Sequence, residues 1–176
     1  MSKTIAISKQ AAAEAVVNKY IPWSMGAGFV PVPLADIAAI TGVQLKMLAE
    51  ISKIYGVEFS ENRGKSIVFS LLGGVGSLSI AAGVFGSVVK AIPGFGSMLG
   101  AATLPVVAGG ITYATGKVFI QHFESGGTFL NFDSLEAKKV FAEKFEEGKK
   151  EVSALASKVD GKLNQAVATV DQAVGL

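Results

Sequence analysis

Two long runs without a charged residue constrain this sequence more than any other feature. Residues 67–89 and residues 94–116 contain no Asp, Glu, Lys or Arg, and only Lys90-Ala91-Ile92-Pro93 separates them. Each run is longer than the roughly 20 residues that a helix needs to cross a hydrocarbon layer. A short break with proline and glycine between two apolar runs is typical of a helical hairpin. The sequence therefore predicts a glycine-rich hydrophobic helical hairpin over residues 66–123.

The amino acids of the hairpin do not decide between contact with lipid and burial in protein. Glycine, serine and threonine occupy many positions where insertion into lipid would favour Leu, Ile, Phe or Val. Lys90 would have to cross the bilayer or extend from within it. We therefore expect membrane contact on the cytoplasmic side, as a peripheral, re-entrant or hairpin-inserted protein, with a full span less favoured. A hairpin buried between subunits is the alternative.

Glycine is the second unusual feature, because it makes up 21 of the 176 residues. The mean hydropathy is +0.48, and only 17% of the residues are charged. Small residues allow helix backbones to approach closely, in membranes and in packed assemblies. We expect the hairpin to pack tightly against neighbouring helices or other copies. The predicted smooth faces comprise Gly76, Gly83 and Gly86 in the first arm, and Gly96, Gly100 and Ala101 in the second.

Two further helices are predicted before the hairpin. Residues 8–20 form a short helix that the proline and glycines of residues 21–28 should end. Trp23 in that break is either an interfacial anchor or a half-buried aromatic side chain. Residues 34–55 form a second helix that begins after Pro33 and ends at Gly56. Its apolar residues surround most of its circumference, so it should be buried, with Lys46 and Glu50 paired at its edge.

The C-terminal segment reads as one long amphipathic helix over residues 133–176, capped by Asp133 or Ser134. Its partner is lipid, a neighbouring subunit or the rest of its own bundle. We predict an all-α helical bundle over residues 1–132, with residues 133–176 as an amphipathic tail. An apolar stripe recurs every three or four residues, about 3.7 on average, and comprises Phe141, Phe145, Gly148, Val152, Leu155, Val159, Leu163, Val167, Val170 and Val174.

No reaction is indicated by the residues that usually perform one. The chain has no cysteine, one histidine and a net charge of +2, so we expect no metal site, no cofactor and no nucleic-acid partner. His122 has a structural or interfacial role in this interpretation. Gly64-Lys65-Ser66 resembles the end of a phosphate-binding loop, but Phe59 stands where its first glycine is required. We predict no catalytic residues and no enzyme. The N-terminal residues lack the apolar core of a secretory signal, so a cytoplasmic origin is expected.

Several short segments, taken in order, resemble one family. They are PVPLADIAAI at residues 31–40, KAIPGFG at 90–96, TYATGK at 112–117 and HFESGG at 122–127. Together they are similar to the domain-of-unknown-function 697 family (YcjF-like), over roughly residues 15–132. The resemblance implies a helical, membrane-associated module that is often attached to a GTP-binding domain of the Era type. This sequence contains no such domain, so a nucleotide-linked role would need a separate GTPase.

Three functions are consistent with these patterns. The first is a non-enzymatic, membrane-associated scaffold that self-assembles through its hairpin and tail. The second is a regulatory adaptor for a separate GTPase or another membrane partner. The third is a soluble homo-oligomer, a filament or shell, that buries the hairpin between subunits.

Overall fold

The predicted all-α fold is confirmed by the computed structural model, which describes residues 2–27, 35–76 and 96–174. The helices are α1 (Ser2–Ala27), α2 (Ala35–Tyr55), α3 (Glu61–Gly76), α5 (Gly96–Glu124) and α6 (Ser134–Val174). The first charge-free run lies in α3 only as far as Gly76, and the second lies in α5 from Gly96 onward. The intervening turn and the predicted faces at Gly83 and Gly86 lie outside the described residues.

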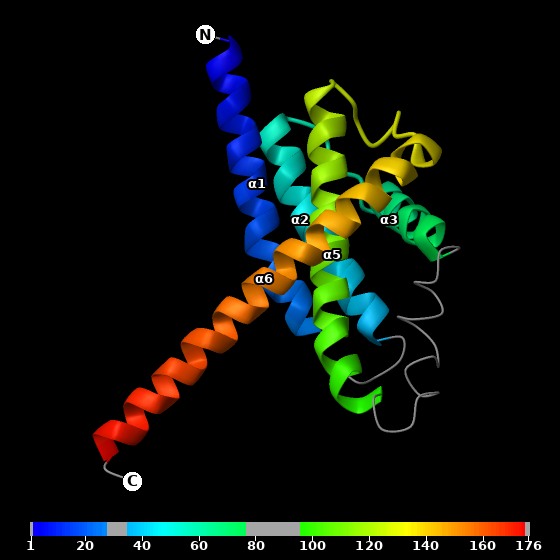
Figure 1. Cartoon of the computed structure of the whole chain (residues 1–176). Coiled ribbons are helices and arrows are strands. Elements are labelled where there is room, and N and C mark those ends of the chain that lie inside the picture. Colours follow the sequence, from blue (N-terminus) through cyan, green and yellow to red (C-terminus); the bar gives the residue numbers. More distant parts are fainter. Residues whose placement is uncertain (1, 28–34, 77–95, 175–176) are drawn as a thin grey trace.

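Helix α5 is the centre of this bundle. It packs against α1 and α2 on one side, while α6 crosses it on the other, and α3 lies against α2 and α6 (Figure 1). Every residue of α5 from 108 to 116 is buried. The second charge-free run is therefore packed against helices of its own chain over this stretch, whereas the predicted faces at Gly76, Gly96, Gly100 and Ala101 stay a prediction.

The close packing explains several of the glycines. A Cβ atom on Gly109 would lie 2.9 Å from a methyl group of Val152, and one on Gly148 would lie 2.8 Å from the Tyr113 ring. A Cβ atom on Gly110 would lie 3.3 Å from the backbone nitrogen of Lys149. Real side chains essentially never approach as closely as the first two distances. The α5–α6 crossing therefore requires glycine on both helices.

Two glycines with positive φ end α2 and α5. Gly56 has φ of 74° and Gly126 has φ of 84°, a conformation that side chains with a Cβ rarely adopt. After each glycine the next amide donates back into the helix, from Val57 to the Ser52 carbonyl and from Gly127 to the His122 carbonyl, both at 2.9 Å. These are Schellman motifs, and the first confirms the predicted end of the second helix at Gly56.

The predicted break at residues 21–28 is wrong, because α1 continues through Pro22 to Ala27. Proline inside a helix removes one hydrogen bond and costs about 3 kcal/mol. Tertiary contacts oppose this loss. Val17, Ile21 and Ser24 are buried on one face of α1. Ser24 also donates a hydrogen bond of 2.9 Å to the Ala108 carbonyl of α5. Neighbouring helices therefore hold this part of α1 helical.

The start of α6 has one of the two predicted caps. Asp133, not Ser134, caps the helix, since its carboxylate accepts from the amides of Leu135 and Glu136 at 2.8 and 3.2 Å.

The predicted apolar stripe of α6 is buried at Phe141, Phe145, Gly148 and Val152, but Leu155 is 41% exposed. Beyond that point α6 continues away from the other helices (Figure 1). The first half of the tail thus packs on its own bundle.

Candidate functional site at the uncharged end of the bundle

Apart from Asp36 in the first turn of α2, charged residues are absent from one end of three packed helices. Residues 20–27 of α1, 37–45 of α2 and 96–116 of α5 contain no Asp, Glu, Lys or Arg, although Asp36 directly precedes the α2 segment. We call these three segments the uncharged end. They meet in space because α1 runs antiparallel to α5, with Ser24 bonded to the Ala108 carbonyl. α2 meets α5 through a hydrogen bond of 3.3 Å from Thr115 to Gln44.

A lysine stands at the boundary of each segment. Lys19 follows the segment on α1 toward the N-terminus, while Lys46 and Lys117 follow those on α2 and α5. A Cβ atom on Gly116 would overlap the Val17 side chain, so Lys117 and Lys19 lie at similar levels of the bundle. Lysine side chains commonly extend their ammonium groups to water from the edge of an apolar zone.

The interior of the uncharged end contains a group of buried polar side chains. Ser24, Gln44, Thr112 and Thr115 are essentially fully buried. Thr112 donates to the Ser24 hydroxyl at 2.7 Å, and Ser24 in turn donates to the Ala108 carbonyl. Hydrogen bonds between buried hydroxyl and amide side chains are a common way of joining helices in apolar surroundings. Sequence reasoning did not identify this cluster, because its members are far apart in the chain and are not distinctive individually.

The exterior of the uncharged end carries an exposed indole. Trp23 is 70% exposed, so its interpretation as a half-buried aromatic side chain is wrong. Pro22, Trp23 and Gly26 of α1 border a hollow of about 490 Å³ together with Val43 of α2. Tryptophan is the residue most typical of membrane–water interfaces, together with tyrosine. This exposure is compatible with an interfacial anchor, which stays a prediction.

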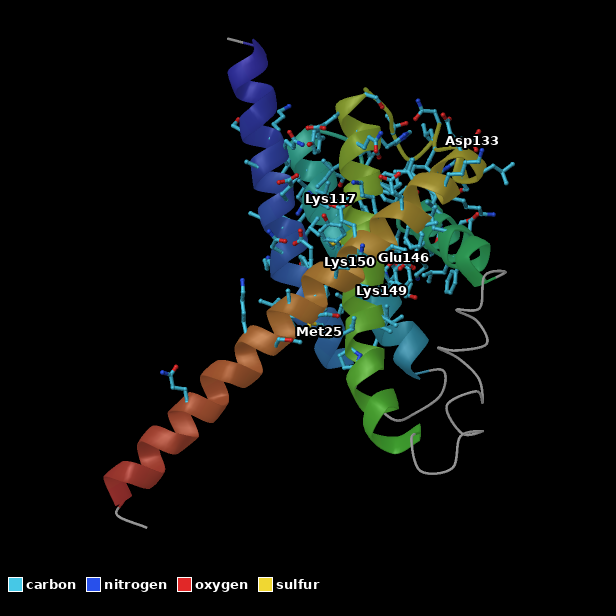
Figure 2. The ribbon with its side chains drawn as sticks, in the orientation of Figure 1. Met25, Lys117, Asp133, Glu146, Lys149 and Lys150 are labelled. Atoms are coloured by element: carbon cyan, nitrogen blue, oxygen red, sulfur yellow. The ribbon has the colours of Figure 1, made fainter. Side chains whose placement is uncertain are left out.

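The α5–α6 crossing limits how deeply this end can enter an apolar phase. Lys149 of α6 lies against Gly110, and its ammonium forms an ion pair of 2.8 Å with Glu146 (Figure 2). A charged helix thus crosses α5 in the middle of its charge-free run. Among the described residues, no helix has both the length and the apolarity to cross a membrane.

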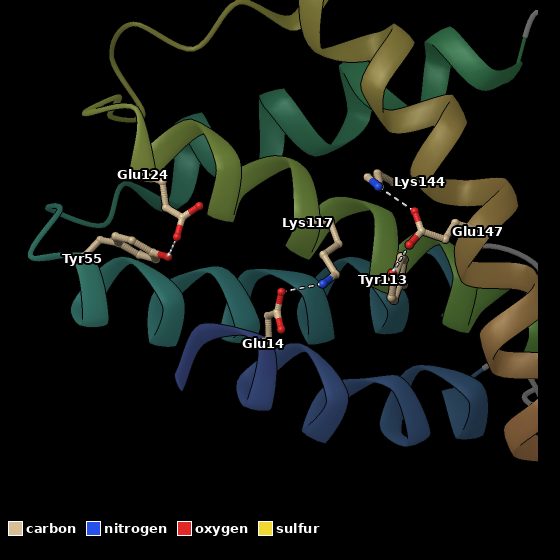
Figure 3. A network of polar contacts seen from close by, with 7 residues as sticks. All are labelled: Glu14, Tyr55, Tyr113, Lys117, Glu124, Lys144 and Glu147. Carbon is tan, nitrogen blue, oxygen red and sulfur yellow. Dashed lines mark hydrogen bonds and ion pairs between the residues drawn. The ribbon is translucent and has the colours of Figure 1, made fainter. Parts of the chain in front are cut away.

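Above the boundary, polar contacts join the helices. Lys117 forms an ion pair of 2.7 Å with Glu14 of α1, and Tyr55 donates to Glu124 at 3.2 Å (Figure 3). Tyr113 donates to Glu147 of α6 at 2.8 Å, and Lys144 binds the other oxygen of the same carboxylate at 2.6 Å.

On α2, Glu50 does not pair with Lys46 as predicted. Glu50 instead accepts from Lys19 and Tyr20 of α1 at 2.9 and 2.6 Å. Both partners come from a neighbouring helix, which the spacing within α2 does not reveal.

Because of the Tyr113 contact, we expect the free energy of unfolding to decrease as the pH rises above about 10. Burial and the hydrogen bond to Glu147 raise the pKa of Tyr113 above its ordinary value. The folded state therefore holds this proton more tightly than the unfolded state, whose tyrosine pKa is about 10. The contribution is complete below pH 10 and is lost as the pH rises further. We expect a loss of about 1 kcal/mol by pH 11 from this residue.

Tyr113→Phe should reduce that loss, as measured by urea unfolding at pH 8, 10 and 11. Some alkaline dependence should persist, since burial raises the pKa of Tyr20 to about 12 and also raises the pKa of Tyr55. Identical pH profiles for the variant and the wild type would show that Tyr113 does not contribute.

The sequence offered two places where chemistry was considered, His122 and Gly64-Lys65-Ser66, and both lie among contacts that support the fold. His122 is half-buried near the other end of α5, with Nε2 2.9 Å from the Thr128 carbonyl and its ring 4.8 Å from that of Phe132. Gly64, Lys65 and Ser66 lie within α3, where Lys65 pairs with Glu61. Within the described part of the chain, no group of three His, Asp or Glu side chains is placed to hold a metal ion.

The fold and this end together define an all-helical module with a charged end and an uncharged end. The chain belongs to the domain-of-unknown-function 697 family, whose sequence model matches residues 1–150. This match confirms the resemblance, and it also includes the first part of α6, which the resemblance had left out. The chain is 41% identical over 165 residues to magnetosome membrane protein 22 of Magnetospirillum gryphiswaldense. The aligned region covers 94% of this chain and 82% of that protein. No solved structure matches the chain.

Proposed function

We propose that this protein is a non-enzymatic, membrane-associated structural protein that docks on lipid through the uncharged end. One observation carries the proposal: apart from Asp36 in the first turn of α2, three helices carry no charged residue at the same end of the bundle, and an exposed Trp23 stands there. The similarity to a protein named as a membrane protein supports it.

The proposed docking is shallow. The uncharged segment of α1 has a length of about 12 Å at 1.5 Å per residue, against roughly 30 Å for a hydrocarbon core. On the α6 side the charged crossing sets a similar limit. We therefore place the protein as a peripheral or re-entrant membrane protein, with its charged end in the cytoplasm.

The scaffolding part of the proposal concerns self-association. The C-terminal half of α6 extends beyond the bundle (Figure 1). In the sequence, the apolar stripe that packs on α5 continues into this half. A long helix in water gains most of its stability from packing, so this half is the surface we assign to other copies. A regulatory adaptor for a separate GTPase remains a hypothesis that rests on the family resemblance.

Vesicle flotation tests the membrane proposal. The full-length protein should float with phospholipid vesicles, and Trp23→Ser should reduce the affinity for the vesicles about tenfold or more. A buried side chain of this size contributes about 1.5–3 kcal/mol. Leu135→Ser is the matched control, because Leu135 is 75% exposed but lies beside Asp133, far from Met25 and the uncharged end (Figure 2).

Two outcomes would count against docking through the uncharged end. One is a wild-type protein that stays with the lipid-free fractions. The other is an equal loss of binding in Trp23→Ser and Leu135→Ser. The protein size, measured with and without detergent, tests the self-association separately.

A further inference from the structure

A second hollow borders the uncharged end, at the fork where α6 leaves α1. It has a volume of about 730 Å³ and is lined by Ile21 and Pro22 of α1 and by Val152, Leu155, Lys150 and Lys158 of α6. Pro22 also lines the hollow beside Trp23, so the two hollows adjoin. The fork therefore lies where the charged and uncharged parts of the molecule meet.

The charge of the fork is positive on balance. Lys150 and Lys158 are exposed, and within the described part of the chain neither forms an ion pair. Glu151 is the one acidic residue that lines the same hollow. The lysines face a neutral α1 segment, whose contributions are Asn18, Ile21 and Pro22. Two ammonium groups thus stand beside an apolar floor.

We infer that the fork binds the headgroup of an anionic phospholipid, with its phosphate at Lys150 and Lys158 and its acyl chains toward Pro22 and Leu155. An apolar floor beneath two ammonium groups matches the two parts of such a lipid. Basic residues near an anionic membrane surface contribute about 1 kcal/mol each. The inference rests on the proposed membrane docking and names the lipid class that this docking prefers.

Flotation of the full-length protein on two kinds of vesicle tests the inference. One kind is phosphatidylcholine alone, and the other is an equal mixture of phosphatidylcholine and phosphatidylglycerol. The wild type should bind the anionic vesicles about 30-fold more tightly, roughly fivefold for each of the two lysines. The preference should shrink in high salt, which screens exposed charges.

Lys150→Gln with Lys158→Gln should abolish most of the anionic preference while leaving binding to phosphatidylcholine unchanged. Lys138→Gln with Lys139→Gln is the matched control, because it removes the same charge from the first turns of α6. That control should keep the preference. A thermal unfolding profile equal to that of the wild type would show that each variant is folded.

The possible results separate the inference from the proposal beneath it. Equal binding of the wild type to both vesicles would overturn the lipid preference and leave the docking intact. Equal losses in the two double variants would show a general charge effect and would also overturn the assignment to the fork. Binding to neither vesicle would overturn the docking itself.

Discussion

Phe119→Ala should lower the free energy of unfolding by about 3–5 kcal/mol, the range for truncating a fully buried phenylalanine. Phe119 has no exposed surface and lies at the centre of an aromatic cluster near the charged end of α5. Its ring centroid is 4.8 Å from that of Phe132, 5.4 Å from that of Phe129 and 5.6 Å from that of Phe123. The cluster joins α5 to the turn that begins α6, so the variant should also loosen α6.

Urea unfolding followed by circular dichroism measures the effect. Phe69→Ala is the matched control, because Phe69 is 50% exposed on α3. This change should lower the free energy of unfolding by under about 1 kcal/mol. A similar small loss for Phe119→Ala would mean that the turn does not pack on α5 as described.

Gly116→Leu should destabilise the protein by about 3 kcal/mol, at the upper end of the range for overpacking a core. A Cβ atom at this position would overlap the side chain of Val17, so α1 would have to move away from α5. Even Gly116→Ala should be destabilising. This sign is unusual, because replacing glycine by alanine inside a helix normally stabilises it by about 0.5–1 kcal/mol.

Gly42→Ala should change the stability of the same bundle in the opposite direction. No atom lies within 4 Å of a Cβ built on Gly42, so this change should raise stability. Combining Gly116→Ala with Val17→Ala should harm the protein less than the sum of the two changes, because the smaller side chain leaves room. A stabilising Gly116→Ala, or additive effects with Val17→Ala, would contradict the close α1–α5 contact.

The sequence predicted those elements whose signals are local. The ends of α2 and α5 follow from Gly56 and Gly126, and the start of α6 follows from Asp133. The continuation of α1 through Pro22 could not be predicted, since it depends on contacts between Ser24 and α5. The same reason explains why Glu50 was assigned to Lys46 when it binds Lys19.

The candidate site was only partly visible in the sequence. The charge-free runs and Trp23 were recognised, and the lysine that ends each run could have been noticed as well. Which segments share one end of the bundle depends on the antiparallel packing of α1 and α5, which the patterns do not specify. The division between residues 1–132 and 133–176 remains a prediction, although Phe141 to Val152 pack into the bundle.

The fluorescence of Trp23 tests the central claim most directly, because it is the single tryptophan and requires no substitution. On addition of phospholipid vesicles, its emission should shift to shorter wavelength. Lipids brominated on their acyl chains should quench it, since the indole would lie at the edge of the hydrocarbon layer. Emission that keeps the wavelength of a water-exposed indole, without quenching, while the protein floats with the vesicles would contradict docking through the uncharged end.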